Sequence, residues 1–244
     1  MARPTIDLLW HRPPPSRRGR KPGLTVGQVV STAIALADAE GLDAVSMRRM
    51  AQELGVVPMT LYTYVPDKAA LLDLMLDALY LEMSRSEPAG TEWRDRARAV
   101  AHDNRVLYDT HPWAAELSSS RPPLGPGLMA KYEHELAAFA GTGLPDTEVD
   151  HALTFLLGFV QHSSRARAQA RAAAAEESDE QWWAERGPLL DEVLDRERYP
   201  LAVRIGAAAG AELGAAYDPD HAYAFGLERV LDGLGALIGA GRRQ

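Results

Sequence analysis

The sequence predicts an all-α protein, and three observations support this fold class. Apolar residues recur at three- and four-residue spacing along most of the chain, as they do on one face of a helix. Residues that cap helix N-termini stand directly before several of these segments. No segment shows the apolar and polar alternation that is typical of strands. With 244 residues, 46% of them hydrophobic, the chain can bury one large core or the cores of a small and a larger domain.

The composition excludes several classes of site. There is no cysteine, so disulfides, thiol nucleophiles and cysteine metal ligands are all absent, which fits a reducing cytoplasm. The first twenty residues lack the apolar stretch of a signal peptide, and no window approaches the roughly 18 apolar residues of a membrane span. We therefore expect a cytoplasmic protein without membrane contact.

Charge is distributed unevenly along the chain, whose net charge is -8. Residues 1–68 contain nine Lys or Arg and six Asp or Glu, a balance of +3, whereas residues 69–244 contain 17 and 28, a balance of -11. Most of the positive charge lies in "RPPPSRRGRKPG", residues 12–23, which is too rich in proline, glycine and like charge to fold alone. We interpret residues 1–24 as a flexible basic arm; a solubilising tail is the alternative.

The two segments after the arm have clear helix boundaries. Thr25 is positioned to cap a helix over 26–40, and Gly41 is a natural stop. Ser46 is positioned to cap a shorter helix over 47–54. Both N-termini are therefore predicted from local side chains alone.

Two further helices follow a glycine. Gly55 ends the second helix, and a proline, which is favoured at a first helical position, opens a third over 58–64. Asp67 is positioned to cap a fourth helix, over 68–83. Two short helices joined by a tight glycine turn make a helix-turn-helix, whose second helix suits the DNA major groove.

The third helix has an apolar side and a polar side. Leu61 and Val65, four residues apart, can hold it to the core. Hydroxyls and aromatic edges that suit phosphates and bases come from Thr60, Tyr62, Thr63 and Tyr64. The alternative is a helical hairpin of an unrelated all-α protein, in which the tyrosines would be half-buried core residues.

The segment "SMRRMAQELGVVPMTLYTYVPDKAALLDLM" resembles the DNA-binding signature of the TetR family of bacterial repressors, and the resemblance covers about residues 25–80. "RPPLGP" followed by "YEHELAAFAGTGL" is similar to the regulatory domain of the subgroup that contains the tetracycline repressor. The resemblance implies a helix-turn-helix DNA-binding domain over 25–70 and a helical effector-binding and dimerisation domain over 71–244.

The family pattern also implies which residues contact DNA, and Tyr62 is the assignment that it supports best. Met59 and Thr63 occupy base-reading positions but differ from the residues of the tetracycline repressor there. The operator of this chain therefore cannot be inferred from that of the tetracycline repressor. Together with the arm, the predicted DNA-binding residues are Arg17, Arg18, Arg20, Lys21, Thr25, Ser46, Arg48, Pro58, Met59, Thr60, Tyr62, Thr63, Tyr64 and Lys68.

The arm contains "RRGRKP", which resembles the AT-hook, a motif whose arginines enter narrow A·T-rich minor grooves. Lys21 stands between the arginine and the proline, where it departs from that motif. Minor-groove reading and simple attraction to phosphate therefore both remain open.

The rest of the chain predicts more helices, over 92–110, 112–117, 126–140 and 147–170, and a last one that begins near residue 220. An alanine-rich, acidic segment, residues 171–181, is interpreted as a mobile connection despite its helix propensity. No other structure is predicted between it and the last helix.

Two of these helices carry apolar seams at bundle spacing. One seam consists of Val149, Leu153, Leu156 and Val160; the other consists of Leu227, Val230, Leu234 and Leu237. Two such helices from each of two subunits would form a four-helix bundle, and the two-fold symmetry of a homodimer would suit a palindromic operator. The alternative is that both seams belong to the core of one subunit.

No catalytic pattern is present: the seven histidines are scattered, and neither H-E-x-x-H nor G-x-S-x-G occurs. We expect no enzymatic activity, no cofactor and no metal site. By resemblance, an effector pocket is lined by the helices that contain 93–110, 128–140 and 147–165. Its candidate residues are Asn104, Tyr108, Trp113, Glu135, Phe155 and Phe159.

The sequence therefore predicts a dimeric transcriptional repressor that binds a palindromic double-stranded operator and is released by a small-molecule effector. By resemblance, the effector would favour a position of the fourth helix that separates the two recognition helices. The alternative is a small-molecule-binding or enzymatic helical protein with a degenerate DNA-binding module.

Overall fold

The computed structural model describes residues 5–10, 24–117, 121–215 and 217–241, and these ranges contain helices and turns but no strand. The long helices are α2 (Val26–Glu40), α5 (Lys68–Glu82), α6 (Trp93–Thr110), α8 (Pro126–Leu136), α9 (Asp146–Glu176), α10 (Asp179–Val193), α11 (Pro200–Leu213) and α12 (Pro219–Gly241). The short ones are α1 (Thr5–Trp10), α3 (Met47–Glu53), α4 (Pro58–Leu61), α7 (Pro112–Glu116) and the 3-10 turns η1 (Leu42–Ala44) and η2 (Ala137–Phe139). The all-α prediction is confirmed. Among these helices, none is long and apolar enough to cross a membrane.

The N-terminal unit, α2 to α5, begins its helices where the sequence predicts. The side chains of Thr25, Ser46 and Asp67 each accept a hydrogen bond from a backbone N–H in the first turn of α2, α3 and α5. Gly41 and Gly55 have φ values of 84° and 64°, a region that favours glycine, and they follow the ends of α2 and α3.

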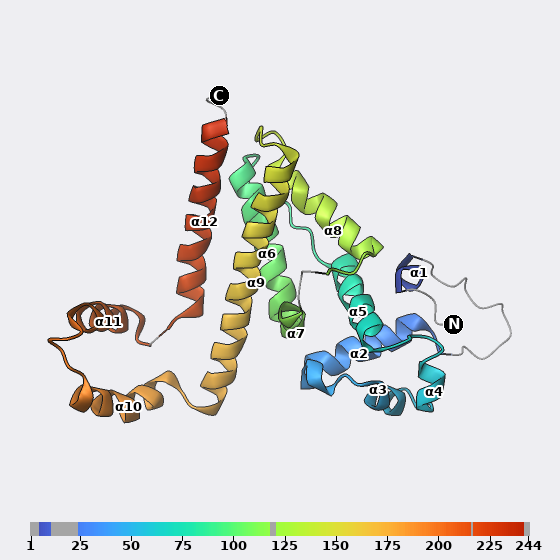
Figure 1. Cartoon of the computed structure of the whole chain (residues 1–244), viewed down its shortest axis with the longest axis horizontal. Helices are drawn as coiled ribbons and strands as arrows, with labels where there is room; N and C mark the ends of the chain where they lie inside the picture. Colours follow the sequence, from blue (N-terminus) through green and yellow to red (C-terminus); the bar gives the residue numbers. More distant parts are fainter. Residues whose placement is uncertain (1–4, 11–23, 118–120, 216, 242–244) are drawn as a thin grey trace.

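One apolar core runs from this unit into the larger part of the chain. Val29, Met50 and Leu61 are fully buried in the N-terminal unit, and Leu156 of α9 and Leu231 of α12 are fully buried in the larger part. Figure 1 shows α5 leading from the N-terminal unit to the larger helical part, where it packs along α8. In that part, α6 packs against α7, α9 and η2, and α12 packs against α9.

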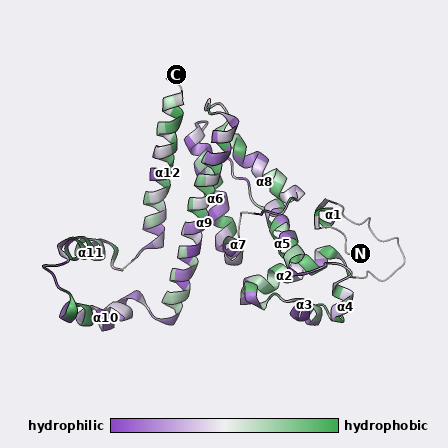
Figure 2. Cartoon of the chain, viewed as in Figure 1, coloured by the Kyte–Doolittle hydropathy of each residue, from purple (hydrophilic) through white to green (hydrophobic). Residues whose placement is uncertain are grey.

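Helices α10 and α11, which we call the projecting arm, extend away from the rest of the chain (Figure 1). None of their residues is buried, although Leu189, Val193, Leu201 and Ile205 are large and apolar. Figure 2 shows hydrophobic residues on both helices. The arm therefore presents apolar surface that this chain leaves uncovered.

The structure corrects three predictions of secondary structure. The third helix ends at Leu61, and residues 62–64 form a turn. The segment 171–181 is not a simple connection: α9 continues to Glu176, because its alanines favour helix, and the sequence analysis missed all of α10 and α11. Of the predicted flexible arm, residues 5–10 are helical and pack against α5, whereas residues 11–23 lie outside the described ranges.

Most residues of the two apolar seams are buried within one subunit, so their assignment to a dimer interface is wrong for those residues, whereas Leu237 is exposed. Leu153, Leu156 and Val160 of α9 are buried within the single chain, as are Val230 and Leu234 of α12. Spacing alone cannot distinguish a partner in the same chain from one in a second copy, because both bury the same stripe.

Candidate DNA interface and effector site

The turn between α3 and α4 is fixed by backbone hydrogen bonds and by a buried anchor. Gly55 N donates to Gln52 O at 3.1 Å, and Val56 N donates to Ala51 O at 2.9 Å. Leu61, the last residue of α4, is fully buried, as is Val65 in the turn that follows. A four-residue helix gains its stability from this anchorage rather than from its own hydrogen bonds.

The other side of α4 faces solvent. The side chain of Met59 is 74% exposed, and Tyr62, Thr63 and Arg48 are also exposed, whereas Thr60 and Tyr64 are half-buried. The Thr63 hydroxyl donates to Thr60 O at 2.7 Å, so its oxygen keeps its lone pairs for an incoming donor. Hydroxyl, aromatic and guanidinium groups of this kind are used by proteins to contact bases and phosphates.

Three other predicted DNA contacts already have partners within the chain. Thr25 and Ser46 are exposed but serve as helix caps. Lys68 is half-buried, and its Nζ donates to Leu42 O at 3.5 Å, which ties the start of α5 to η1. The arm residues Arg17, Arg18, Arg20 and Lys21 lie outside the described ranges.

A buried polar cluster contains three of the predicted effector residues, Asn104, Tyr108 and Glu135. Asn104 Nδ2 donates to Glu135 Oε1 at 2.6 Å, and Lys131 Nζ donates to Glu135 Oε2 at 2.7 Å. All three side chains are buried. Burial lowers the pKa of Lys131, and the neighbouring Glu135 carboxylate opposes this shift.

Two tyrosines belong to the same cluster. Tyr80 of α5 lies under Lys131, with Nζ 5.3 Å from the ring centroid, and burial raises the pKa of Tyr80 to about 12. Burial also raises the pKa of Tyr108. Asn104 Oδ1 is buried without a hydrogen-bond partner among the described residues, so the cluster retains one free acceptor. We call Tyr80, Asn104, Tyr108, Lys131 and Glu135 the interior polar cluster.

The sequence missed Tyr80 and Lys131. A Lys–Glu pair at i,i+4 spacing, such as Lys131 and Glu135, normally indicates a solvent-exposed helix face, and here it is buried. The signal that could have found it is its position on a helix that the family resemblance places at the pocket.

The other three predicted effector residues lie elsewhere. Trp113 Nε1 donates to Asp38 Oδ1 at 2.7 Å, which places Trp113 where α7 meets α2. Phe155 is 57% exposed on the outer side of α9. Phe159 stacks on Tyr223 of α12, with ring centroids 5.7 Å apart.

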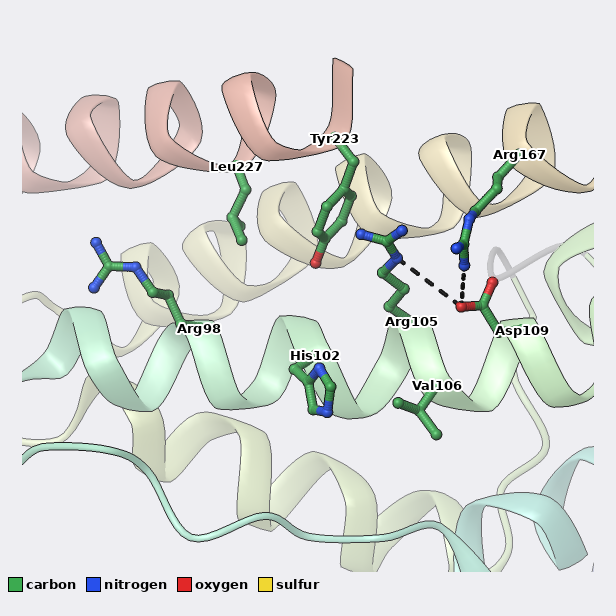
Figure 3. A pocket seen from close by; sticks show the side chains of 8 residues that line it. All are labelled: Arg98, His102, Arg105, Val106, Asp109, Arg167, Tyr223 and Leu227. Atoms are coloured by element: carbon green, nitrogen blue, oxygen red, sulfur yellow. Dashed lines mark hydrogen bonds and ion pairs between the residues drawn. The ribbon is translucent and has the colours of Figure 1, made fainter. Parts of the chain in front are cut away.

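A cavity of about 400 Å³ lies on another side of α6, between α6, α9 and α12 (Figure 3). Arginines from two helices line it together with Tyr223, and the sequence did not predict it. Separately, the described residues contain no group of three or more histidines or carboxylates placed to hold a metal ion.

A helix-turn-helix unit with an exposed recognition surface, joined by one helix to a larger helical part with a buried polar cluster, defines a ligand-responsive DNA-binding regulator. The family profiles agree: that of the bacterial regulatory proteins of the tetR family matches residues 29–75, and that of the tetracyclin repressor-like C-terminal domain matches residues 87–238. The chain belongs to the tetR family, as its sequence resemblance predicted.

Full-length relatives support this assignment. The chain is 38% identical over 237 residues to the HTH-type transcriptional repressor DrrR1 of Streptomyces coeruleorubidus, covering 96% of this chain and 86% of DrrR1. It is 33% identical over 237 residues to an HTH-type transcriptional regulator of Saccharopolyspora erythraea, covering 95% and 92%.

Solved structures give the same answer. Apo ActR from Streptomyces coelicolor matches with a TM-score of 0.72 and 28% identity, covering 89% of this chain and 100% of that one. ActR in complex with actinorhodin matches with a TM-score of 0.70 and 28% identity, covering 87% and 96%. The chain is an effector-responsive, DNA-binding transcriptional repressor.

Proposed function

We propose that this repressor binds a palindromic operator as a homodimer, with α4 in the major groove, and that its effector binds at the interior polar cluster. The observation that supports the DNA half is the burial pattern around α4: Leu61 is fully buried, while Met59 in α4 and Tyr62 in the turn that follows are exposed. A side chain on a rigidly anchored helix can read a groove, because its position is set by the core.

The exposed groups divide by chemistry into two roles. Met59, Thr63 and Arg48 are assigned to bases, whereas the Tyr62 hydroxyl is assigned to phosphate. Further contacts to the DNA backbone are assigned to six residues of the same unit: Thr25, Ser46, Pro58, Thr60, Tyr64 and Lys68.

The basic arm is assigned to additional DNA binding through Arg17, Arg18, Arg20 and Lys21. Replacing these four residues by Gln should reduce the magnitude of the slope of log K against log salt by about 0.9 for each phosphate that the arm no longer neutralises. Binding isotherms at several salt concentrations measure this slope. Because substitution leaves α1 in place, a changed slope reports the removal of charge. An unchanged slope would show that the basic arm does not bind DNA and serves only as a solubilising tail.

The dimer is assigned to the outer faces of α9 and α12, because the inner faces are used within the subunit. Phe155 on α9 and Phe225 on α12 are 57% and 61% exposed, and Leu237 is also exposed. Exposed small residues on the same helices, such as Gly158 and Ala236, permit close helix approach. Two copies joined here would form a four-helix bundle.

The projecting arm extends this proposed interface. It is connected directly to both α9 and α12, and two helices with no buried residue cannot gain stability from tertiary packing within this chain. In the proposed homodimer, the surface of the second copy would cover their apolar side chains.

The effector is assigned to the interior polar cluster because Asn104 Oδ1 is a buried acceptor without a partner among the described residues, which calls for a ligand that donates a hydrogen bond. The solved complexes of ActR with actinorhodin and with (S)-DNPA support a small-molecule effector in this fold.

A buried link connects the cluster to the DNA-binding unit. Asp77 of α5 accepts a hydrogen bond from Leu128 N at 2.9 Å, at the first turn of α8, the helix that carries Lys131 and Glu135. A Cβ on Gly127 would lie 1.9 Å from Asp77 O, so only glycine permits this approach. An effector that prefers a different position of α8 would therefore shift α5, and with it α4, out of register with the operator.

Selection of bound DNA from a random pool tests the function. A palindrome whose half-site centres are separated by about 34 Å, one helical turn, is expected from a two-fold dimer. Recovery of no preferred sequence, with no binding of the intact protein to DNA at low salt, would instead support a ligand-binding protein with a degenerate DNA-binding module.

A further inference from the structure

The cavity between α6, α9 and α12 has the size of a small-molecule site. Its volume of about 400 Å³ lies within the range of about 300–1,000 Å³ that is usual for ligand pockets. Its lining residues are Arg98, His102, Arg105, Val106, Asp109, Arg167, Tyr223 and Leu227, and we call it the arginine groove. It lies apart from the interior polar cluster, whose residues do not line it.

The groove is rich in hydrogen-bond donors. Three guanidinium groups line it, but the only carboxylate in its lining is Asp109. Arg98 is held in place from outside the lining by Glu228, which accepts from its Nε and Nη2 at 3.0 Å each. This hydrogen bonding lowers the pKa of Glu228.

Arg105 and Arg167 are fixed by carboxylates in the same way. Arg105 is paired with Asp220, and Arg167 is paired with Asp109 and Asp220. Arg167 Nε lies 3.0 Å from an Asp220 oxygen, yet the pair lacks hydrogen-bond geometry, so the buried Nε has no hydrogen-bond partner among the described residues. The carboxylates therefore fix the guanidinium groups in position, and at least one of their N–H donors, Arg167 Nε, has no hydrogen-bond partner among the described residues.

An aromatic stack forms one wall. The guanidinium of Arg105 lies over the Tyr223 ring, with Cζ 4.2 Å from the centroid, and Tyr223 stacks on Phe159 at an interplanar angle of 22°. Gly226 permits this stack, because a Cβ there would lie 2.5 Å from the Phe159 ring. In Figure 3 the Arg105 guanidinium and the Tyr223 ring lie together between α6 and α12.

We propose that the arginine groove binds a planar aromatic acid. The ring would lie on the free face of the Arg105 guanidinium and against Val106 and Leu227, because guanidinium planes stack on aromatic rings. The acid would accept hydrogen bonds from the arginines, which favour anionic oxygens over neutral ones. This site goes beyond the interior effector site of the proposed function, and its occupancy is measurable without DNA.

Calorimetric titration of the full-length protein with 2-naphthoate tests the site, with 2-naphthylmethanol as the uncharged analogue. We expect 2-naphthoate to bind once per chain and the alcohol to bind about tenfold more weakly, the effect of removing a charge-assisted hydrogen bond. Absence of 2-naphthoate binding at millimolar concentration, or equal binding of the alcohol, would overturn the proposal.

Two arginines that both bridge α6 and α12 give a matched pair of variants. Arg105→Gln removes a guanidinium that lines the groove, whereas Arg94→Gln removes the 3.0 Å ion pair with Asp232, which lies outside the lining. We expect R105Q to weaken 2-naphthoate binding about tenfold and R94Q to leave it within about twofold. If R105Q and R94Q weakened 2-naphthoate binding equally, Arg105 would have only a structural role and the proposal would be overturned.

A third variant covers the case in which R105Q does not fold. Leu227 is half-buried and lines the groove, so Leu227→Trp should fill the groove without removing an ion pair. We expect this variant to lose 2-naphthoate binding while its circular dichroism spectrum remains that of a helical protein. Retained binding in folded L227W would also overturn the proposal. Operator binding by the same preparations tests the DNA function separately, so loss of either activity alone identifies which assignment failed.

Discussion

The DNA-binding unit and the projecting arm are built from the same local signals but have opposite surroundings. Asp67 caps α5, and Ser178 caps α10 in a capping box with Gln181. Gly214 ends α11 in the left-handed conformation, as Gly55 with positive φ follows α3. Yet α2 to α5 share a buried core, and α10 and α11 bury nothing.

This difference separates what makes a helix from what holds it in place. Caps and glycines satisfy the unpaired backbone groups at helix ends, and they act within a few residues. Packing depends on a second apolar surface, which the DNA-binding unit finds in its own chain. Helices α10 and α11 have no such surface among the described residues, and we propose that a second copy supplies it.

The largest expected effect contrasts a covered with an uncovered face of the α9–α12 pair. Leu156→Glu should cost about 5 kcal/mol or more, enough to unfold the subunit, because it buries an unpaired charge in a fully covered position. Phe225→Glu should leave the subunit folded and shift the dimer toward monomer. Sedimentation together with circular dichroism measures both; a folded F225E dimer with unchanged affinity would place the subunit contact elsewhere.

Truncating one leucine in each region comes next. Leu61→Ala should lower the free energy of unfolding by about 2–5 kcal/mol and abolish operator binding, because it leaves a cavity under α4. In the dissociated subunit, Leu201→Ala, at a position 64% exposed in α11, should change the free energy of unfolding by less than about 0.5 kcal/mol. Urea denaturation measures the free energy of unfolding of each variant. Equal decreases in the two variants would mean that the projecting arm is packed as firmly as the DNA-binding unit.

Removing one cap in each region sharpens the contrast further. Asp67→Ala should lower the free energy of unfolding by about 1 kcal/mol, because Ala70 N is left without its acceptor at the start of a packed helix. Ser178→Ala removes the same kind of cap from α10 but should affect only local opening of the arm. Hydrogen exchange separates the two outcomes: S178A should accelerate exchange in α10 alone.

The smallest effect on stability is expected from two exposed tyrosines. Tyr62→Phe should weaken operator binding about two- to tenfold, independently of the DNA sequence, because only a phosphate-directed hydroxyl is removed. Tyr199→Phe, beside α11, is the control and should leave operator affinity unchanged. Fluorescence anisotropy with a selected operator compares them, and equal affinities of Y62F and wild type would remove Tyr62 from the interface.

The sequence predicted the elements of the DNA-binding unit well but those between residues 171 and 218 poorly. Thr25, Ser46, Asp67 and Gly55 act on neighbouring backbone groups, so the four residues can be interpreted without knowing the fold. From residue 171 onward, the helix propensity of the alanines indicated a helix, whereas the polarity indicated a loop. No buried apolar stripe distinguished between these two interpretations.

The candidate sites were only partly predictable for a related reason. Asn104, Tyr108 and Glu135 do lie in one cluster, but Trp113 lies against α2, and Phe155 is on the outer surface. Helical spacing places a residue on a face of its own helix. It does not state which helix that face meets.

By itself, then, the sequence determined the helix starts of the DNA-binding unit, the buried anchor of α4 and the family, because each depends on residues close together along the chain. Only the tertiary structure decided that the apolar seams of α9 and α12 are mostly buried within one subunit, that the Lys131–Glu135 pair is buried, and that arginines of α6 and α9 line one groove with Tyr223 of α12. These arrangements join segments far apart in sequence. Several pairings would bury the same apolar stripes, and the packing of the whole chain selects among them.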